Sequence, residues 1–262
     1  DYTLTSSPVI KNEAMSPQTN HSLSVDCVIF GFDGHSLKVL LVEREFVDGR
    51  GEKIVDYKLP GNLIFENEDL RTSAYRTLAE YTSTRDIYLR QLHVFSRPDR
   101  VSGDELRWLN EYYRVNTTRV VTVAYYSLVK LDGRLIACAA DKGARWFDVE
   151  SVNRLAMDHK TILAQALEML NRQLLTEPIA FELLSSRFTL RQLQMLYEAI
   201  LGIEIDNRNF RKKVLSSGYI RETGEKEKNV SHKPAAYYTF DKQKYQKDVR
   251  QKFRLNFINW QL

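Results

Sequence analysis

The chain has 262 residues, of which 43% are hydrophobic and 27% charged, and its formal net charge is +4. This length and apolar content support one large or two ordinary domains and exclude a wholly disordered chain. No stretch approaches the roughly 18 apolar residues of a membrane span, and residues 1–22 lack the basic start and apolar centre of a signal peptide. We therefore expect a cytoplasmic protein without a membrane partner.

Charge is distributed unevenly along the chain. Residues 176–262 contain 16 Lys and Arg against 10 Asp and Glu, so this part carries +6 and the remainder carries −2. A basic end on a mildly acidic body predicts two domains, of which the second binds a polyanion. The two cysteines, Cys27 and Cys138, lie in apolar runs typical of strands, and no CxxC metal-ligand pair exists. We therefore expect both cysteines in the core and no metal or other cofactor.

The residues before the C-terminal part predict an arm followed by an α+β domain. Residues 1–21 are polar and have little periodicity, which indicates an N-terminal arm. Strand patterns then alternate with amphipathic helices over residues 22–175. In chain order we expect a hairpin at 24–44, a charged loop at 45–56, a helix at 69–81, a strand at 87–95, a short inserted helix at 104–114, a long strand at 118–133 and a helix at 158–174.

The C-terminal part, residues 176–262, predicts a small DNA-binding domain. Pro178 closely follows the long helix and marks the boundary. A helix with Thr189 as its N-cap ends at Gly202, and a basic helix closed by Gly218 follows it. Residues 219–241 then predict two strands around a charged loop. Helix, turn, basic helix and β-hairpin is the order of a winged helix-turn-helix.

The basic helix has the residue types that bind DNA. Four of the six side chains from Arg208 to Lys213 are cationic, while Phe210 and Val214 can dock the helix onto its domain. Arg can bond guanine and Asn adenine, whereas Lys mostly contacts phosphate. The alternative is a solvated charged surface. The expected DNA-binding residues are Arg208, Asn209, Arg211 and Lys212 of the helix, with Lys228, His232 and Lys233 of the hairpin loop.

The segment from Pro60 to Thr84 aligns without a gap to the Nudix box, G-x5-E-x7-R-E-U-x-E-E-x-G-U. The matching residues are Glu68, Arg76, Leu78 and Glu80, and the departures are Asn62, Thr77, Tyr81 and Ser83. A Nudix hydrolase collects several carboxylates on this helix to hold Mg²⁺ against a pyrophosphate. Because Thr77 and Tyr81 replace two of them one turn apart, we expect no catalytic residues, no metal and no enzymatic activity.

Further segments resemble the Nudix-related transcriptional regulators of the NrtR type. They are residues 60–78, the strand 118–129, and RLAMDH at 154–159, where Met157 departs from the family pattern. The resemblance covers about 24–241. It implies an N-terminal Nudix-like α/β/α ligand-sensing domain, a C-terminal winged-helix domain for operator DNA, and a homodimer that acts mainly as a repressor. Within this family the sequence looks most similar to arabinose-responsive regulators of sugar-utilisation genes, which implies L-arabinose as effector.

A pentose site needs paired hydrogen-bond donors and acceptors beside an aromatic or apolar wall. The polar groups that the Nudix arrangement would bring near one cleft are Glu43, Arg44, Lys58, Gly61, Asn62, Arg97 and Asp99, although each could be an exposed surface group instead. His159 is expected to cap or pack the helix that follows it. Two alternatives to the arabinose regulator stand: a regulator with ADP-ribose as effector, and a Nudix hydrolase of ADP-ribose-like diphosphates with a basic accessory domain.

Overall fold

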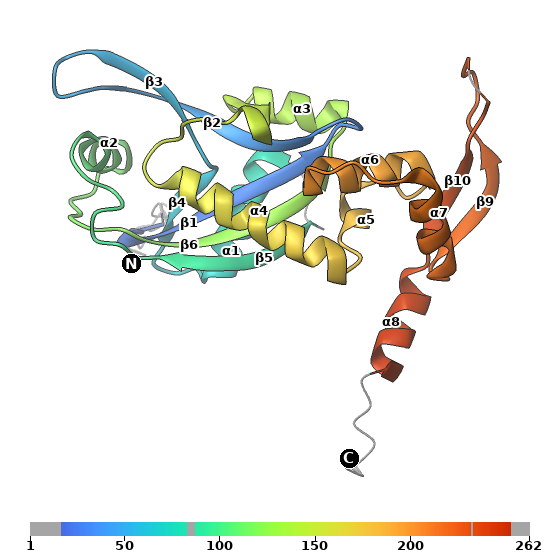
Figure 1. Cartoon of the computed structure of the whole chain (residues 1–262). Helices are drawn as coiled ribbons and strands as arrows, with labels where there is room; N and C mark the ends of the chain where they lie inside the picture. Colours follow the sequence, from blue (N-terminus) through green and yellow to red (C-terminus); the bar gives the residue numbers. More distant parts are fainter. Residues whose placement is uncertain (1–16, 83–86, 232, 253–262) are drawn as a thin grey trace, which may run out of the picture.

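A computed structural model describes residues 17–82, 87–231 and 233–252. It consists of an α/β/α sandwich followed by a smaller domain that ends in a projecting hairpin and a helix (Figure 1). The sandwich contains β1 (Thr19–Phe32), β2 (Leu37–Val47), β3 (Lys53–Lys58), β4 (Gly61–Phe65), α1 (Leu70–Thr82), β5 (Tyr88–Phe95), α2 (Asp104–Tyr113), β6 (Val121–Lys130), α3 (Gly133–Ala140), β7 (Ala144–Asp148), the 3-10 turn η1 (Val149–Ser151) and α4 (His159–Thr176). The second domain contains α5 (Ala180–Leu183), β8 (Phe188–Thr189), α6 (Leu190–Leu201), α7 (Asn207–Ser216), β9 (Ile220–Lys226), β10 (Ala236–Phe240) and α8 (Lys242–Lys252).

The large sheet is built around β1. Its main path runs β3-β2-β1-β6-β5, and β4 pairs with β1 while β7 pairs with β2. β1 runs parallel to β6 from the pair Leu23–Val121 to the pair Phe32–Lys130 and antiparallel to its other partners. Residues 24–32 of β1 are all buried, because both faces of the sheet are covered. Any polar side chain in this stretch therefore lies inside the molecule.

Helices cover the two faces of the sheet. α1 and α3 bury Ala74, Leu78, Leu135 and Ala139 against one face. α4 packs on the other face through the apolar stripe that the sequence predicts, Ile162, Leu163, Ala166 and Leu170. α1 begins where Asp69 accepts a hydrogen bond from the Thr72 N–H at 2.7 Å. α1 and α4 match their predicted spans within two residues.

The second domain has the predicted winged-helix order. Thr189 and Gln192 form a capping box at the start of α6, and Gly202, with φ of 65°, ends that helix in the left-handed conformation that glycine favours. Asp206 caps α7 by accepting from the Asn209 N–H at 2.8 Å. β8, β10 and β9 form a three-stranded sheet in that order, within the described part of the chain, and β9 and β10 are the two arms of the projecting hairpin (Figure 1).

One apolar cluster joins the two domains. It runs from the sheet through Leu170 and Leu174 of α4 and Leu183 of α5 to Phe188 and Leu193 of the winged helix. α4 also contacts α6 directly. The two domains therefore pack against each other around α4 and α5.

Three segments differ from the sequence expectation. Residues 134–140, expected as a strand with Cys138, form α3, because Asp132 caps the first turn and Leu135 and Ala139 make a buried helical stripe. The expected charged loop at 45–56 is largely the β2–β3 hairpin, whose strands carry a Lys53–Glu45 ion pair at 2.8 Å. α8 was not expected, because its sequence is mostly polar and has only Tyr245 and Val249 as apolar residues.

The N-terminal arm can be compared only in part. β1 begins at Thr19, so the last residues of the expected arm belong to the sheet, while residues 1–16 lie outside the described residues. Cys27 is buried in β1 as expected, and burial raises the pKa of its thiol. No helix in the described ranges is long and apolar enough to span a membrane.

Candidate functional site

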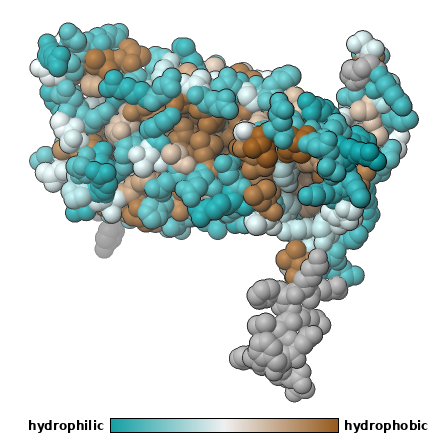
Figure 2. Space-filling model, viewed as in Figure 1, coloured by the Kyte–Doolittle hydropathy of each residue, from teal (hydrophilic) through white to brown (hydrophobic). Residues whose placement is uncertain are grey.

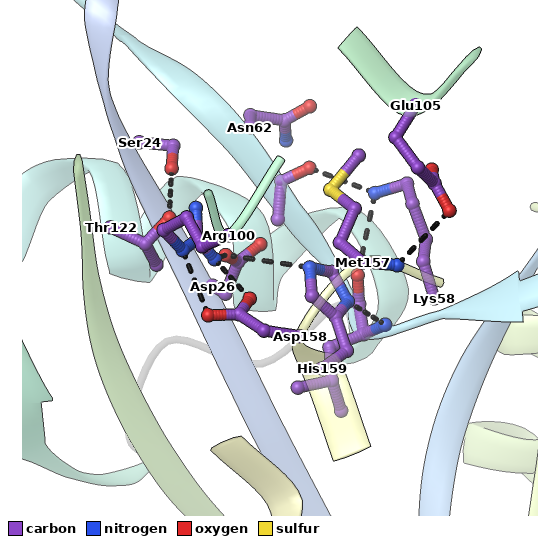
Figure 3. A network of polar contacts seen from close by, with 12 residues as sticks. Ser24, Asp26, Lys58, Asn62, Arg100, Glu105, Thr122, Met157, Asp158 and His159 are labelled. Carbon is purple, nitrogen blue, oxygen red and sulfur yellow. Dashed lines mark hydrogen bonds and ion pairs between the residues drawn. The ribbon is translucent and has the colours of Figure 1, made fainter. Parts of the chain in front are cut away.

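A narrow pocket of about 30 Å³ opens between β1, β4, α2 and the start of α4. Trp108, Leu109 and Tyr113 of α2 give it an apolar wall. The opposite side is polar, as Figure 3 shows, and its charged or amide side chains are Asp26, Lys58, Asn62, Arg100 and His159. Four separate segments of the chain therefore bring hydrogen-bonding groups to one place.

Asp26 is the acidic group of this pocket. Its side chain is 9% exposed, and its Oδ2 lies 3.9 Å from Nη2 of Arg100 and 3.7 Å from Nε2 of His159. No described residue donates a hydrogen bond to this carboxylate. Gly61 faces it from β4, where a Cβ would lie only 1.9 Å from Oδ1 of Asp26, so this position requires glycine.

His159 and Arg100 are fixed by their other contacts. Nδ1 of His159 accepts a hydrogen bond from the Leu59 N–H at 2.9 Å, so in the neutral ring Nε2 carries the proton and faces Asp26. Burial lowers the pKa of His159, which favours this neutral form. Arg100 is bound by both carboxylate oxygens of Asp158, at 2.9 and 2.6 Å.

Lys58 and Asn62 complete the polar side. The buried Lys58 ammonium donates to the carbonyls of Leu59 at 3.3 Å and Gly61 at 3.0 Å. Burial lowers the pKa of Lys58, and the nearby Asp26 opposes this effect. The Tyr113 hydroxyl donates to Oδ1 of Asn62 at 3.2 Å, which ties α2 to β4.

A second set of contacts fastens α2 over the pocket. Glu105 of α2 pairs with the buried Arg44, whose guanidinium also binds Asp56 and stacks on Trp108 at 4.7 Å. The other oxygen of Glu105 accepts from the Met157 N–H at 3.2 Å. Met157 has φ of 53°, a strained conformation for a side chain of this kind, at the turn into α4. The cover of the pocket and the start of α4 are thus linked through one carboxylate.

The structure brings together three of the residues expected at the ligand site: Lys58, Gly61 and Asn62 line the pocket. Arg44 instead lies behind it in the ion cluster with Glu105. Glu43 lies outside the pocket lining and contacts Tyr57 and Arg145, as an outward-facing residue within β2.

In the loop between β5 and α2, Arg97 and Asp99 were expected at the ligand site, but neither lines the pocket. Arg97 and Asp99 bind each other on the surface of the loop and are 81% and 65% exposed, whereas Arg100, the next residue, turns inward. Sequence reasoning also missed Asp26, Asp158 and His159 as site residues. The signal for Asp26 was a single acid within the apolar run SVDCVIF.

The helix that aligns with the Nudix box, α1, presents few free acids. Glu68 is paired with Arg76 at 2.5 Å, and Thr77 and Tyr81 are buried against the sheet. Glu80 is exposed. Among the described residues, no group of three or more His, Cys, Asp or Glu side chains is arranged to hold a metal.

The basic helix of the second domain displays its cations. Phe210 is buried against Tyr197, and the ring centroids are 5.7 Å apart, as expected for the docking residue. Arg208, Asn209, Arg211 and Lys212 are exposed on α7, and none of the cations has an ion pair with a described residue. Figure 2 shows hydrophilic side chains over the part of the domain that carries this helix. Lys228 and Lys233 are exposed on the hairpin, while His232 lies outside the described residues.

Comparison with known proteins assigns both halves of the chain. Residues 20–166 match the family described as "NUDIX domain", and residues 180–240 match "NrtR DNA-binding winged helix domain". The chain belongs to the NrtR-type regulators. The expected fold, a Nudix domain followed by a winged helix, is therefore confirmed.

Relatives of this NrtR-type chain include a curated protein and solved structures. An "ADPR responsive transcriptional repressor NtrR" of Acinetobacter baylyi is 28% identical over 227 residues, which are 85% of this chain and 83% of the relative. The crystal structure of Shewanella oneidensis NrtR is similar with a TM-score of 0.66 and 30% identity, covering 84% of this chain and 94% of that one. The same protein complexed with a 27mer DNA has a TM-score of 0.66 and 29% identity, covering 83% and 93% of the two chains.

These relatives support some of the expectations drawn from the sequence and not others. They support the NrtR-type resemblance, DNA binding and regulation. They do not support the nearer resemblance to arabinose-responsive regulators, because the relatives reported above carry the name NrtR or NtrR, and one of them is described as ADPR responsive. The expected homodimer stays a prediction.

The contact between Gly61 and Asp26 gives a direct test of the pocket geometry. We expect Gly61→Ala to destabilise the protein by roughly 1–3 kcal/mol, because the new Cβ would overlap Oδ1 of Asp26 and the Val25 carbonyl. Urea unfolding at neutral pH measures the change. Gly133→Ala, where a Cβ meets nothing within 4 Å, is the control and should be close to neutral. Equal stabilities for the two variants would contradict the close approach of β4 to Asp26.

Proposed function

We propose that this protein is a transcriptional repressor that binds operator DNA through its winged helix and binds ADP-ribose as an effector in its Nudix domain. The observation that carries the proposal is the similarity to the Acinetobacter ADPR-responsive repressor, which extends over both domains. ADP-ribose thereby replaces L-arabinose, the effector that the sequence alone suggested. The proposal therefore does not include regulation of sugar-utilisation genes.

The Nudix domain serves as a sensor in this proposal. Mg²⁺ requires several oxygen ligands, yet the two box positions at Thr77 and Tyr81 point uncharged side chains into the core. Glu68 is held by Arg76 and by the Phe65 N–H at 2.9 Å, which leaves it little capacity for an ion. The residues of α1 therefore do not fit a hydrolytic magnesium site, and they support ligand binding without turnover.

The winged helix would bind DNA with α7 in the major groove. The exposed Arg208 and Asn209 lie in its first turn, where side chains of a recognition helix reach base edges. Arg211 and Lys212 follow on the exposed surface, suited to base or phosphate contacts. The β9–β10 hairpin, with Lys228 and Lys233, would contact the flanking backbone. A homodimer would bind two such half-sites related by twofold symmetry.

The effector proposal predicts that ADP-ribose weakens DNA binding. With an operator selected from a random duplex library, we expect saturating ADP-ribose to lower the affinity for that DNA about 5- to 150-fold, which is the usual range of coupling between an effector site and a second binding site. Fluorescence anisotropy at fixed salt measures it, with AMP and L-arabinose as controls that leave the affinity unchanged. Release of DNA by L-arabinose and not by ADP-ribose would overturn the proposed effector.

The sensor proposal also predicts that ADP-ribose survives contact with the protein. After incubation with Mg²⁺, chromatography should show ADP-ribose intact, because α1 lacks a set of free carboxylates. An active Nudix hydrolase treated identically verifies the assay. Appreciable formation of AMP and ribose 5-phosphate would instead support the hydrolase alternative.

The recognition helix predicts a specific change in salt dependence. Arg211→Ala with Lys212→Ala should weaken DNA binding and reduce the slope of log affinity against log salt by roughly 2, because two phosphate-neutralising cations are lost. Arg134→Ala with Lys142→Ala removes the same charge from exposed positions of the Nudix domain and serves as the control. If both double variants keep the wild-type slope, α7 is not the DNA-binding helix.

A further inference from the structure

The pocket under α2 contains a buried acceptor that the protein leaves without a donor. Asp26 is about nine-tenths buried, and no hydrogen bond reaches its carboxylate from the described residues. An ionised carboxylate only accepts hydrogen bonds, and leaving it unmatched in a buried site is costly. A group that enters this pocket must therefore donate to Asp26. Phosphate oxygens cannot do so and would be repelled by its charge.

Three donors surround the same space. Nε2 of His159 lies 3.7 Å from Oδ2 of Asp26, which is too far for a hydrogen bond between them. A small group between the two could accept from His159 and donate to Asp26. Lys58 uses two of its N–H bonds on backbone carbonyls and retains a third. The amide nitrogen of Asn62 has no acceptor among the residues described. The entering group must therefore accept as well as donate, as a hydroxyl does.

The pocket already contains the carboxylates of Asp26 and Asp158. Arg100 is paired with Asp158, and burial lowers the pKa of both Lys58 and His159, which works against positive charge on either. An added phosphate would leave the site with excess negative charge, whereas an uncharged polyol would not. Trp108 and Leu109 form the apolar part of the lining, and they repel an ionic group in the same way.

The size and closure of the pocket identify which end of the effector enters. About 30 Å³ admits hydroxyl groups but no purine. The Tyr113–Asn62 hydrogen bond is part of the lining, so a ligand that places a small group in this space leaves its bulk outside. ADP-ribose has two ends, adenine and the terminal ribose, and only the ribose is made of vicinal hydroxyls.

We propose that this pocket is a subsite for the vicinal hydroxyls of a terminal pentose, with Asp26 as acceptor and His159, Lys58 and Asn62 as donors. The assignment rests on the proposed ADP-ribose function and specifies how that effector is recognised. The pentose hydroxyls replace the missing partners of Asp26, while the diphosphate and adenine lie outside the pocket.

The test compares ADP-ribose with ADP, which lacks the terminal pentose. Titration calorimetry on the full chain should give wild-type protein a clear preference for ADP-ribose. Asp26→Asn should reduce that preference by about tenfold, because a carboxylate acceptor becomes an amide facing other donors. Glu43→Gln, an acid outside the pocket, is the matched control and should keep the wild-type preference.

A second variant guards against misfolding of Asp26→Asn. Asn62→Ala removes one donor and the Tyr113 contact from a half-buried position, and it should reduce the same preference several-fold. An unchanged preference in a folded Asp26→Asn protein, or in Asn62→Ala if the first variant unfolds, overturns the subsite.

The subsite and the proposed effector can fail separately. If ADP-ribose still releases DNA but the preference does not depend on Asp26, the subsite is wrong and the effector stands. If ADP-ribose does not bind while D-ribose or L-arabinose binds in an Asp26-dependent manner, the subsite stands and the effector is wrong. Absence of binding by all four compounds overturns both.

Discussion

The packing of α4 is the constraint on which both halves of the molecule depend. Its first residue, His159, forms part of the polar pocket, its middle buries Ile162 and Leu170 on the sheet, and its end places Leu174 in the cluster shared with the winged helix. Each fully buried side chain of this size contributes roughly 1.5–3 kcal/mol. A movement at the pocket that displaced α4 would therefore disturb the packing of the DNA-binding domain, which gives the two proposed sites a physical connection.

Several of the charged groups of the pocket are buried in compensated form. Arg100 and Asp158 form a two-point ion pair, and Gly61 allows β4 to approach Asp26 more closely than any side chain would permit. A buried ion pair of this kind adds little net stability, but removal of one partner leaves an uncompensated charge. The arrangement is suited to ligand recognition. The Asp26 carboxylate can still accept hydrogen bonds, and the Arg100–Asp158 pair helps to fix the side chains around it.

The Nudix helix keeps part of the box sequence, and in the proposed sensor it acts as a scaffold. Glu68 and Arg76 keep their places, but here they bind each other and fix the loop before α1. Thr77 and Tyr81 have become core residues. The fold thus supplies a pocket and a scaffold, and the function has to be argued from the residues present.

The sequence by itself determined the elements whose signals are local: the amphipathic stripe of α4, the Thr189 cap, the docked basic helix with Phe210, and the domain order. It also identified Lys58, Gly61 and Asn62, which are close in sequence. Only the tertiary structure decided that Asp26, Arg100 and His159 meet them, because β1 pairs with β4 and α4 starts beside both. The choice between Arg97 and Arg100 depended on which way a loop turns, which periodicity does not encode. The helix at 134–140 has local signals in the Asp132 cap and the spacing of Leu135 and Ala139, but so short an apolar run fits a strand equally well until its packing is known.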